Sequence, residues 1–463
     1  MRAEEYISPF SARYASPEMS FLFSAHFKIT TYRKLWASLA KAQQKLGLPI
    51  THRQVAELED NVGKIDFLAA KAYEKKFKHD VMAHIYAFGD QCPDAKAIIH
   101  LGATSTFVTD NTDLIQLKKG LELLLSKIGQ VIRLMAPLSE KCAASPCLGY
   151  THFQAAQPTT IGKRICLWLQ DFLSDAEEFE RQIGSLPFLG AKGATGTQSS
   201  FLALFDGDID KVENLEKRLA SDFGFSKILP IAGQTYPRKI DLTVLNALAS
   251  FAASAHKLAT DIRLLAHDGE MLEGFEEEQV GSSAMPYKHN PIYSERICGL
   301  ARFVIALAQN PAYTAATQWL ERSLDDSSNR RFSIPESFLG ADAILNLLIH
   351  LFTHLKIDEA LALEHLMEKI DLVSMENILM LAVKKGADRQ KTHEILRKSS
   401  QKTKKEIAKE LHLEVGELEP LLNPLKLIGC APEQVRKFLK EHVGPFLSRH
   451  KDKQLPNVPR IEV

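Results

Sequence analysis

One short segment combines residues that could bind a carboxylate. It reads Gly281-Ser282-Ser283-Ala284-Met285-Pro286-Tyr287-Lys288-His289-Asn290-Pro291. Its small residues leave the backbone free to move, whereas its two prolines stiffen the chain around Lys288. Because proline suits the first turn of a helix, a helix is predicted to begin near Pro291. The free amides at that helix start, together with the Lys288 ammonium, would favour a bound carboxylate.

A histidine elsewhere in the chain offers a proton donor. His152 lies in the segment Tyr150-Thr151-His152-Phe153-Gln154. An unperturbed imidazole has a pKa of about 6.5, so it changes charge near neutral pH and suits general acid catalysis. Considered alone, His152 would be interpreted as a structural histidine, just as Gly-Ser-Ser alone would be an ordinary surface loop. The surrounding segments therefore determine whether a catalytic or a structural interpretation applies.

The elements that must position these groups are predicted to be long helices. Apolar residues from Leu114 to Leu138 recur at alternating spacings of three and four, the pattern of a helix packed lengthwise on others. A second stretch, from Arg238 to Met271, carries two adjacent apolar stripes. Unbroken, it would span roughly 50 Å at about 1.5 Å per residue. Shorter apolar seams cover 161–179 and 341–355, and strand-like alternation is scarce.

These seams predict an all-α fold with three helical domains. Residues 1–110 contain shorter helices punctuated by glycine and proline, residues 111–360 carry the long helices, and residues 361–463 return to shorter ones. A central bundle of this length favours assembly with other subunits, so we expect it to form the core of an oligomer.

Composition limits the possible partners and compartments. Lysine plus arginine total 57, and aspartate plus glutamate also total 57, so the formal net charge is zero. General attraction to nucleic acid or to an anionic membrane is therefore not expected. The N-terminus lacks the apolar region of a secretory signal, and no uninterrupted apolar run approaches the ~20 residues of a membrane span. The six cysteines show no zinc-site spacing and are expected to be free thiols in a reducing cytoplasm.

The complete loop 281–291 resembles a signature of the fumarase/aspartase superfamily, because it matches the motif GSxxMPxKxN at every fixed position. Two further segments resemble that superfamily's other signature regions and occur in the expected order. They are Gly102-Ala103-Thr104-Ser105 with Thr109-Asp110-Asn111, and Tyr150-Thr151-His152-Phe153-Gln154 with Ala156-Gln157-Pro158. The resemblance implies a β-elimination that releases fumarate.

Further segments look like the adenylosuccinate lyase family, in its animal-type branch, between about residue 6 and residue 350. They are residues 11–16, 78–84, 190–198, 233–239 and 321–331. The resemblance implies cleavage of adenylosuccinate to AMP and fumarate, and of SAICAR to AICAR and fumarate, in purine nucleotide biosynthesis. It implies no metal and no organic cofactor.

Such an elimination needs a base for the carbon-bound proton, positive charge for the doubly charged carboxylate that forms, and an acid for the departing nitrogen. By resemblance, Ser282 is the base and His152 is the acid. Lys288 would stabilise the aci-carboxylate, and with the loop amides it would have to lower the pKa of the serine. His79 matches a second family histidine, placed near the substrate phosphate, that helps to orient the acid.

The substrate is a polyanion, and arginine forks suit its phosphate and its carboxylates. The resemblance implies nucleotide-side contacts from Arg13, Tyr14, Lys78, His79, Asp80, Arg322, Ser327 and Arg331, with Arg296 likewise matched. It implies contacts to the succinyl carboxylate from Thr104, Ser105 and Gln234. The chain departs from the family where Lys78 replaces a common arginine, Ala155 a frequent proline and Pro237 a usual serine. None of these departures removes a proposed catalytic group.

In this superfamily the matched segments meet only in a tetramer, where three subunits build each active site, so a homotetramer is expected. Two alternatives stand beside this interpretation. One is another superfamily enzyme, such as argininosuccinate lyase or fumarase, against which the segments around Arg13, His79 and Arg331 argue. The other is a catalytically silent structural protein, against which intact Ser282, His152 and Lys288 argue.

Overall fold

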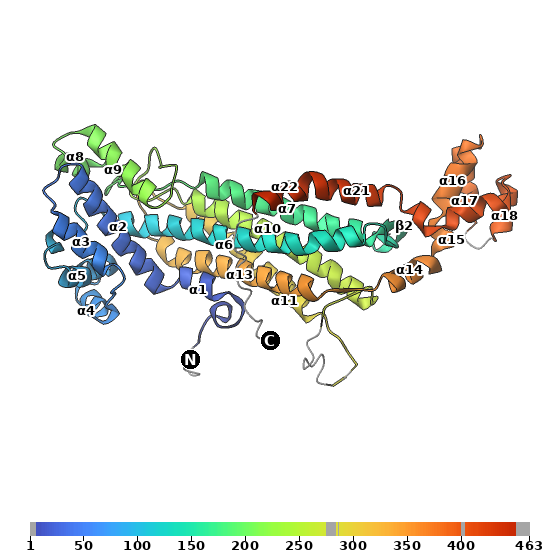
Figure 1. The fold of residues 1–463 in the computed structure, drawn as a ribbon, viewed down its shortest axis with the longest axis horizontal. Coiled ribbons are helices and arrows are strands. Elements are labelled where there is room, and N and C mark those ends of the chain that lie inside the picture. The colour runs from blue at the N-terminus through green and yellow to red at the C-terminus, as the bar shows by residue number, and fades with distance from the viewer. Residues whose placement is uncertain (1–5, 275–283, 286, 400–402, 451–463) are drawn as a thin grey trace.

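Short helices gather at both ends of a long helical rod (Figure 1). The structure is a computed structural model that describes residues 6–274, 284–285, 287–399 and 403–450. Five helices make the rod: α6 (Ser105–Lys141), α7 (Ile161–Ser185), α10 (Lys239–His267), α11 (Ile292–Leu307) and α13 (Asp326–His354). Helix α10 packs on α7, α11 and α13, and α6 packs on α7 and α13. The predicted all-α fold with a long central bundle is confirmed.

The predicted apolar seams face the interior of this bundle. Leu114, Leu121 and Ile128 on α6 are fully buried. On α10 the alanines Ala252 and Ala259 are also fully buried, which allows the neighbouring helices to approach closely. Burial of one such leucine stabilises the fold by roughly 1.5–3 kcal/mol. The rod is therefore held by continuous apolar contact along its length.

By length and composition alone, α13 could cross a membrane, although the sequence offers no uninterrupted apolar run of that length. In the bundle, 83% of its apolar window is buried. This burial is typical of a core helix in a bundle of this kind.

Two groups of short helices flank the rod. Helices η1 (Phe10–Tyr14) and α1 (Pro17–Leu22) pack on α13 along the rod, and the N-terminal group comprises α2 (Ala25–Lys45), α3 (His52–Asn61), α4 (Phe67–Phe77), α5 (Asp80–Gln91) and η2 (Lys96–Ile98). Helices α8 (Ser199–Leu204) and α9 (Ile209–Asp222) lie beside it, with α9 on α2. Helix α12 (Asn310–Ala316) joins α11 to α13.

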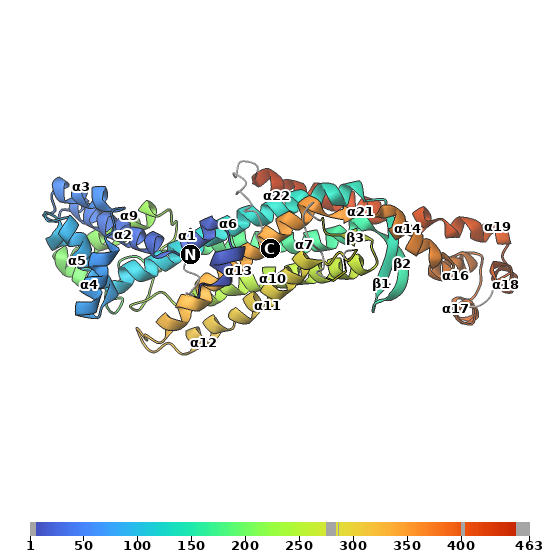
Figure 2. The ribbon, with the colours of Figure 1, turned by 90° about the horizontal axis from the view of Figure 1, so that it is seen from below.

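The C-terminal group lies at the opposite end and then returns along the rod (Figure 2). It comprises α14 (Glu359–Glu368), α15 (Ile370–Val373), α16 (Met375–Lys384), α17 (Arg389–Arg397), α18 (Lys404–Glu410), α19 (Val415–Leu418), η3 (Glu419–Leu422) and α20 (Pro424–Leu427). The returning helices are α21 (Ala431–Phe438), η4 (Leu439–Val443) and α22 (Gly444–Arg449). Helix α21 packs on α7. The domain boundaries near residues 110 and 360 stay a prediction.

Two small antiparallel sheets were not anticipated from the sequence. Strands β1 (Pro146–Thr151) and β2 (Gln154–Thr160) form a hairpin that stands out from the rod near its C-terminal end (Figure 2). Strand β3 (Met271–Leu272) pairs with β4 (Lys356–Ile357). The first sheet carries His152 at its tip, so an element that the helical pattern did not predict holds the proposed acid.

A buried carboxyl group between α7 and α10 should make stability depend on pH. Asp175 is 5% exposed and accepts a hydrogen bond from Ser250 Oγ at 3.0 Å. Burial raises its pKa to about 6, although hydrogen bonds from Ser254 and Ser250 oppose the shift. In the unfolded chain this carboxyl has a pKa of about 3.9. Because the folded pKa is the higher one, the stability contributed by the protonated form is complete below about pH 4 and is lost as pH rises through about 6.

Asp175→Asn should therefore stabilise the protein at neutral pH, since the amide keeps an acceptor for Ser250 and carries no charge. We expect a gain on the order of 2 kcal/mol above about pH 6, shrinking towards zero below about pH 4. Thermal melts between pH 4 and pH 8 measure it, with the exposed Glu177→Gln on the same helix as control. A melting-temperature difference that is constant across this range would contradict the prediction.

Candidate active site

Several predicted site residues meet where α5 and α6 begin. His79 caps α5, and its Nδ1 accepts the Met82 N–H at 3.3 Å. Because Nδ1 accepts, the neutral ring carries its proton on Nε2, which lies 3.5 Å from Ser105 Oγ. Thr104 and Ser105 occupy the first positions of α6, and the Thr104 side chain does not cap the helix. The amino end of this helix therefore suits a carboxylate, as predicted for these two residues.

Lys78 and Asp80 flank this histidine at a sharp corner. Lys78 ends α4 in the left-handed conformation, with φ 53°, which turns the chain directly into α5. Asp80 Oδ1 accepts the Val81 N–H at 2.8 Å and lies 3.7 Å from His79 Nδ1. All three side chains of residues 78–80 are exposed, so they can meet a ligand.

The predicted residues Gln234, Arg322 and Ser327 lie over a buried ionic network. Within it, Arg238 Nη1 lies 2.9 Å from Asp110 Oδ2, and Arg238 Nε lies 2.6 Å from Asp326 Oδ2. All three of these residues are at most 3% exposed. The network ties α6, the start of α10 and the start of α13 to one another.

This network positions the predicted contacts directly. Arg322 Nη1 donates to Asp326 Oδ1 at 2.8 Å and to Oδ2 at 2.9 Å, which leaves the rest of its guanidinium for another partner. The Gln234 N–H donates to Glu321 O at 3.0 Å, so Gln234 lies beside Arg322. Ser327 is half-buried in the first turn of α13.

Arg331 is exposed on the next turn of α13 and shares its surroundings with Asp80. Both charges act on the buried phenol of Tyr32. Burial, together with the carboxylates of Asp113 and Asp80, raises the pKa of Tyr32, whereas Arg331 lowers it. Arg331 and residues 78–80 therefore lie at the same end of the rod.

A second group of predicted residues lies along the middle of the rod. Arg13 and Tyr14 are in η1, where the Phe10 ring is 5.4 Å from the Phe303 ring of α11. Arg296, also on α11, is half-buried. Its Nη1 is buried and has no acceptor among the described residues. A guanidinium with an unused buried donor fits an anionic ligand.

Helix α11 begins at Ile292 with Pro291 at its cap, as the sequence predicted. The first amides of this helix already have an acceptor within the chain. The Tyr293 and Ser294 N–H groups donate to the two carboxylate oxygens of Glu273 at 2.9 Å and 2.7 Å. The helix start thus binds a carboxylate, as its free amides favour, and this carboxylate is the side chain of Glu273.

Lys288 precedes that helix and is exposed, and its N–H donates to Met285 O at 3.0 Å in a tight turn. Ser282, the predicted base, lies outside the described residues. Its role and that of Lys288 stay predictions.

His152 is exposed at the tip of the β1–β2 hairpin. Thr151 pairs with Gln154, so the turn contains only His152 and Phe153, with φ values of 52° and 56°. Positive φ at both central residues defines the type I′ turn that matches the twist of a hairpin. The strained backbone of this turn holds the imidazole away from the rod.

The length of α6 separates His152 from the residues around His79 within one chain. Ser105, beside His79, begins this 37-residue helix, and the hairpin starts five residues after its end at Lys141. At about 1.5 Å per residue, the helix spans about 55 Å. The structure therefore brings residues 78–80, 104, 105, 234, 322, 327 and 331 together, and it leaves His152 at the other end.

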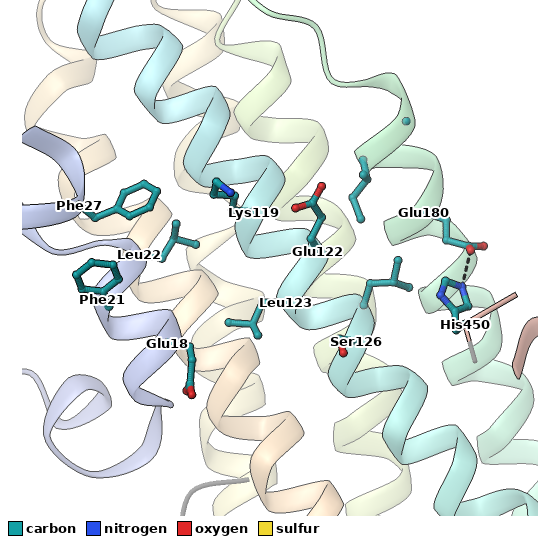
Figure 3. A pocket seen from close by; sticks show the side chains of 13 residues that line it. Glu18, Phe21, Leu22, Phe27, Lys119, Glu122, Leu123, Ser126, Glu180 and His450 are labelled. Carbon is teal, nitrogen blue, oxygen red and sulfur yellow. Dashed lines mark hydrogen bonds and ion pairs between the residues drawn. The ribbon is translucent and has the colours of Figure 1, made fainter. Parts of the chain in front are cut away.

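Two clefts lie away from these residues. One cleft of about 820 Å³ lies between α1, α6 and α7, where His450 Nε2 contacts Glu180 Oε1 at 2.6 Å (Figure 3). Another of about 840 Å³ lies beneath the hairpin and is lined by Tyr150, Thr151 and Phe153. In the described part of the chain, neither cleft is lined by a predicted site residue.

Sequence reasoning missed the residues that hold these groups in place. Asp326 and Arg330 lay in a matched segment without a role, and Asp110 and Arg238 lay in two others. Arg330 bonds Asp241 Oδ2 at 2.7 Å, besides the hydroxyl of Tyr236. The only available signal was that charged residues recur within otherwise apolar helices, since burial of a charge demands a partner.

The chain is similar to known proteins over nearly all of its length. The sequence profile of the family described as "Lyase" matches residues 21–306. The chain is 45% identical to "Adenylosuccinate lyase" of Schizosaccharomyces pombe over 465 residues, which cover 96% of each chain. It is 44% identical to "Adenylosuccinate lyase" of Saccharomyces cerevisiae, with 98% of each chain covered.

Solved structures show the same fold at lower identity. A 3-carboxy-cis,cis-muconate lactonizing enzyme from Pseudomonas putida superposes with a TM-score of 0.81 at 22% identity, covering 94% of this chain and 99% of that one. A fumarate lyase from Mesorhizobium sp. BNC1 superposes with a TM-score of 0.78 at 22% identity, covering 94% of this chain and 100% of that one. These structures establish the fold of the chain.

The hairpin that carries His152 should not tolerate a side chain at Gly149. A Cβ there would lie 2.4 Å from the Gln157 carbonyl oxygen of the facing strand, at the bulge between Leu148 and Tyr150. Because this neighbour is backbone, Gly149→Ala should destabilise the protein by about 1–3 kcal/mol. Urea denaturation and hydrogen exchange of the hairpin amides measure the effect.

A matched control is Gly184→Ala in α7, where an added Cβ meets nothing within 4 Å. Alanine is the better helix former, so this variant should be neutral or slightly stabilising. Equal effects of the two substitutions would contradict the steric argument.

Proposed function

Because the chain belongs to the adenylosuccinate lyase family, we infer that it releases fumarate from adenylosuccinate and leaves AMP. It is a lyase that acts on a carbon–nitrogen bond. By the same chemistry it would release fumarate from SAICAR and leave AICAR, since both leaving amines belong to a phosphoribosylated base or its precursor. The observation that carries this function is the 45% identity over 96% of each chain.

We assign the chemical steps to three residues. Ser282 removes the proton from the carbon beside one carboxylate of the succinyl group. Lys288 stabilises the doubly charged carboxylate that forms. His152 protonates the nitrogen as the carbon–nitrogen bond breaks, which leaves fumarate and the free amine. Exposure of Lys288 and His152 supports these roles, because neither side chain is committed to the core.

The nucleotide is bound at the other end of the rod. His79, with its Nε2 near Ser105, and Arg331, with its guanidinium exposed, lie on the phosphate side. Thr104, Ser105 and Gln234 bind the succinyl carboxylate at the amino end of α6. The unused buried donor of Arg296 supports a further anion contact. We propose no metal and no organic cofactor for this site, and a cytoplasmic location for the protein.

We further propose a homotetramer in which each site combines residues of three subunits. The separation of about 55 Å along α6 supports this assembly, because one nucleotide cannot reach both ends of the rod. Large apolar side chains that are exposed on the central helices also support it. They are Leu264 on α10, Phe303 and Ile305 on α11, and Phe332 on α13.

The substrate assignment is tested by incubating purified protein separately with adenylosuccinate, argininosuccinate and malate. We expect fumarate from adenylosuccinate alone, because residues 78–80 and 322–331 provide the nucleotide side. Chromatographic detection of fumarate and AMP in equal amounts measures the reaction. If adenylosuccinate yields no fumarate, the assignment is wrong.

The shared site is tested with two inactive variants. His152→Ala and Ser282→Ala should each lower turnover by about 10²- to 10⁴-fold, since each removes a proton-transfer group. Sedimentation should show that both variants keep the assembly of the unmodified protein. When the two variants are mixed, dissociated and reassembled, partial activity should return, because some mixed assemblies contain one intact site. Each variant taken alone through the same treatment is the control. The shared site would be refuted if a single variant regained activity, or if the mixture regained none.

A further inference from the structure

A fully buried charged cluster lies in the middle of the rod, at the contact between α6 and α13. Lys127 of α6 and Asp342 of α13 have side chains with 0% exposure. Lys127 Nζ lies 2.5 Å from Asp342 Oδ1 and 2.8 Å from Asn346 Oδ1. The three side chains thus satisfy one another at the contact between α6 and α13.

The stability of the bundle does not by itself explain this cluster. Removing two charges from water costs several kcal/mol per ion, and replacing a buried pair by apolar side chains of similar size is often neutral or stabilising. The surrounding positions, such as Leu124 and Val131 on α6, are apolar and fully buried. An apolar trio at these positions would continue the seam.

The remaining bonds of the cluster go to the main chain of one segment. Asp342 Oδ2 accepts the Ser16 N–H at 2.6 Å. Asn346 Nδ2 donates to Tyr14 O at 3.2 Å. These two bonds bracket the end of η1, which carries Arg13 and Tyr14.

We propose that Asp342 and Asn346, held in place by Lys127, are positioning residues that fix Arg13 and Tyr14 for contact with the nucleotide. This inference rests on the proposed function, which gives Arg13 and Tyr14 their ligand. The cluster touches no reacting atom and acts through the backbone of residues 14–16. Its charges serve to hold that backbone at two fixed points on a rigid helix.

The local geometry shows why such an anchor matters. The Arg13 side chain is exposed and makes no hydrogen bond or ion pair with the described residues. Its position therefore depends on the path of its own main chain. That path is closed on one side by the Ala15 N–H bond to Phe10 O at 2.8 Å and on the other by Ser16, which caps α1. Releasing Tyr14 O and Ser16 N–H would let this turn shift as a unit.

The inference is tested with a double substitution, Lys127→Met with Asp342→Leu, which removes both charges and keeps apolar volume. We expect KM for adenylosuccinate and the inhibition constant for AMP to rise together by about 10-fold, the equivalent of about 1.4 kcal/mol. The inhibition constant for fumarate and kcat should stay within about twofold. If the cluster had a purely structural role, the inhibition constants for AMP and for fumarate would not change by different factors.

Two further variants keep the test decisive if the double substitution does not fold. Asn346→Leu removes the bond to Tyr14 O while the Lys127–Asp342 pair remains. It should also raise the inhibition constant for AMP and leave that for fumarate unchanged, with a smaller rise than in the double substitution. Val131→Ala on α6 is the matched control, since it removes buried volume without touching residues 14–16. It should lower the melting temperature and leave the ratio of the two inhibition constants unchanged.

A double-mutant cycle with Arg13→Ala gives the last measurement. If the cluster acts through Arg13, Asn346→Leu should change the AMP inhibition constant much less in the Arg13→Ala background. Additive effects, or an unchanged AMP inhibition constant in both cluster variants, would overturn the inference. If the unmodified protein releases no fumarate from adenylosuccinate, the proposed function fails instead, and the two failures are thereby distinguished.

Discussion

Lengthwise contact between apolar helix faces holds α6, α10 and α13 side by side. Because this contact runs from one end of the rod to the other, the helices cannot slide without exposing apolar surface along their whole length. The ends of the rod are therefore held at a fixed separation. Most of the candidate site residues lie at an end, on a connection or on a projection of this rigid frame, whereas Arg13, Tyr14 and Arg296 lie along its middle. The frame thus determines which groups a single chain can bring together.

Charged residues inside this apolar frame have a different task. Arg238 joins Asp110 to Asp326 and so fixes the starts of α10 and α13 against α6. Asp342 extends the same principle to the N-terminal segment through the Ser16 N–H. Burial of such groups costs free energy that apolar residues would not cost. In return, these groups give directional hydrogen bonds. A hydrogen bond fixes the position of one backbone atom, whereas apolar contact only holds two surfaces together.

Much of the fold could be predicted from the sequence, because a helical apolar period is a local property. The seams at 114–138, 161–179 and 341–355 became α6, α7 and the last part of α13. The hairpin escaped prediction because its strands lack alternation: in β1, Cys147 and Leu148 are both buried, and Tyr150 and Thr151 are both exposed. In addition, its turn holds His152 and Phe153 in place of glycine or asparagine. The identities of the site residues followed from motifs, as in the segments around Ser105 and Arg322. Their partners did not, since a pair such as Arg238 and Asp110 is joined across the fold and leaves no spacing in the chain.

The length of α6 has a consequence for the life of a newly made chain. His152 and His79 lie at opposite ends of the folded chain, so with the shared site that we propose a single chain would be a latent enzyme. Activity would begin only when the chain meets its copies, and the onset of catalysis after synthesis would depend on concentration. A cell that makes few copies would then hold folded protein that does no work.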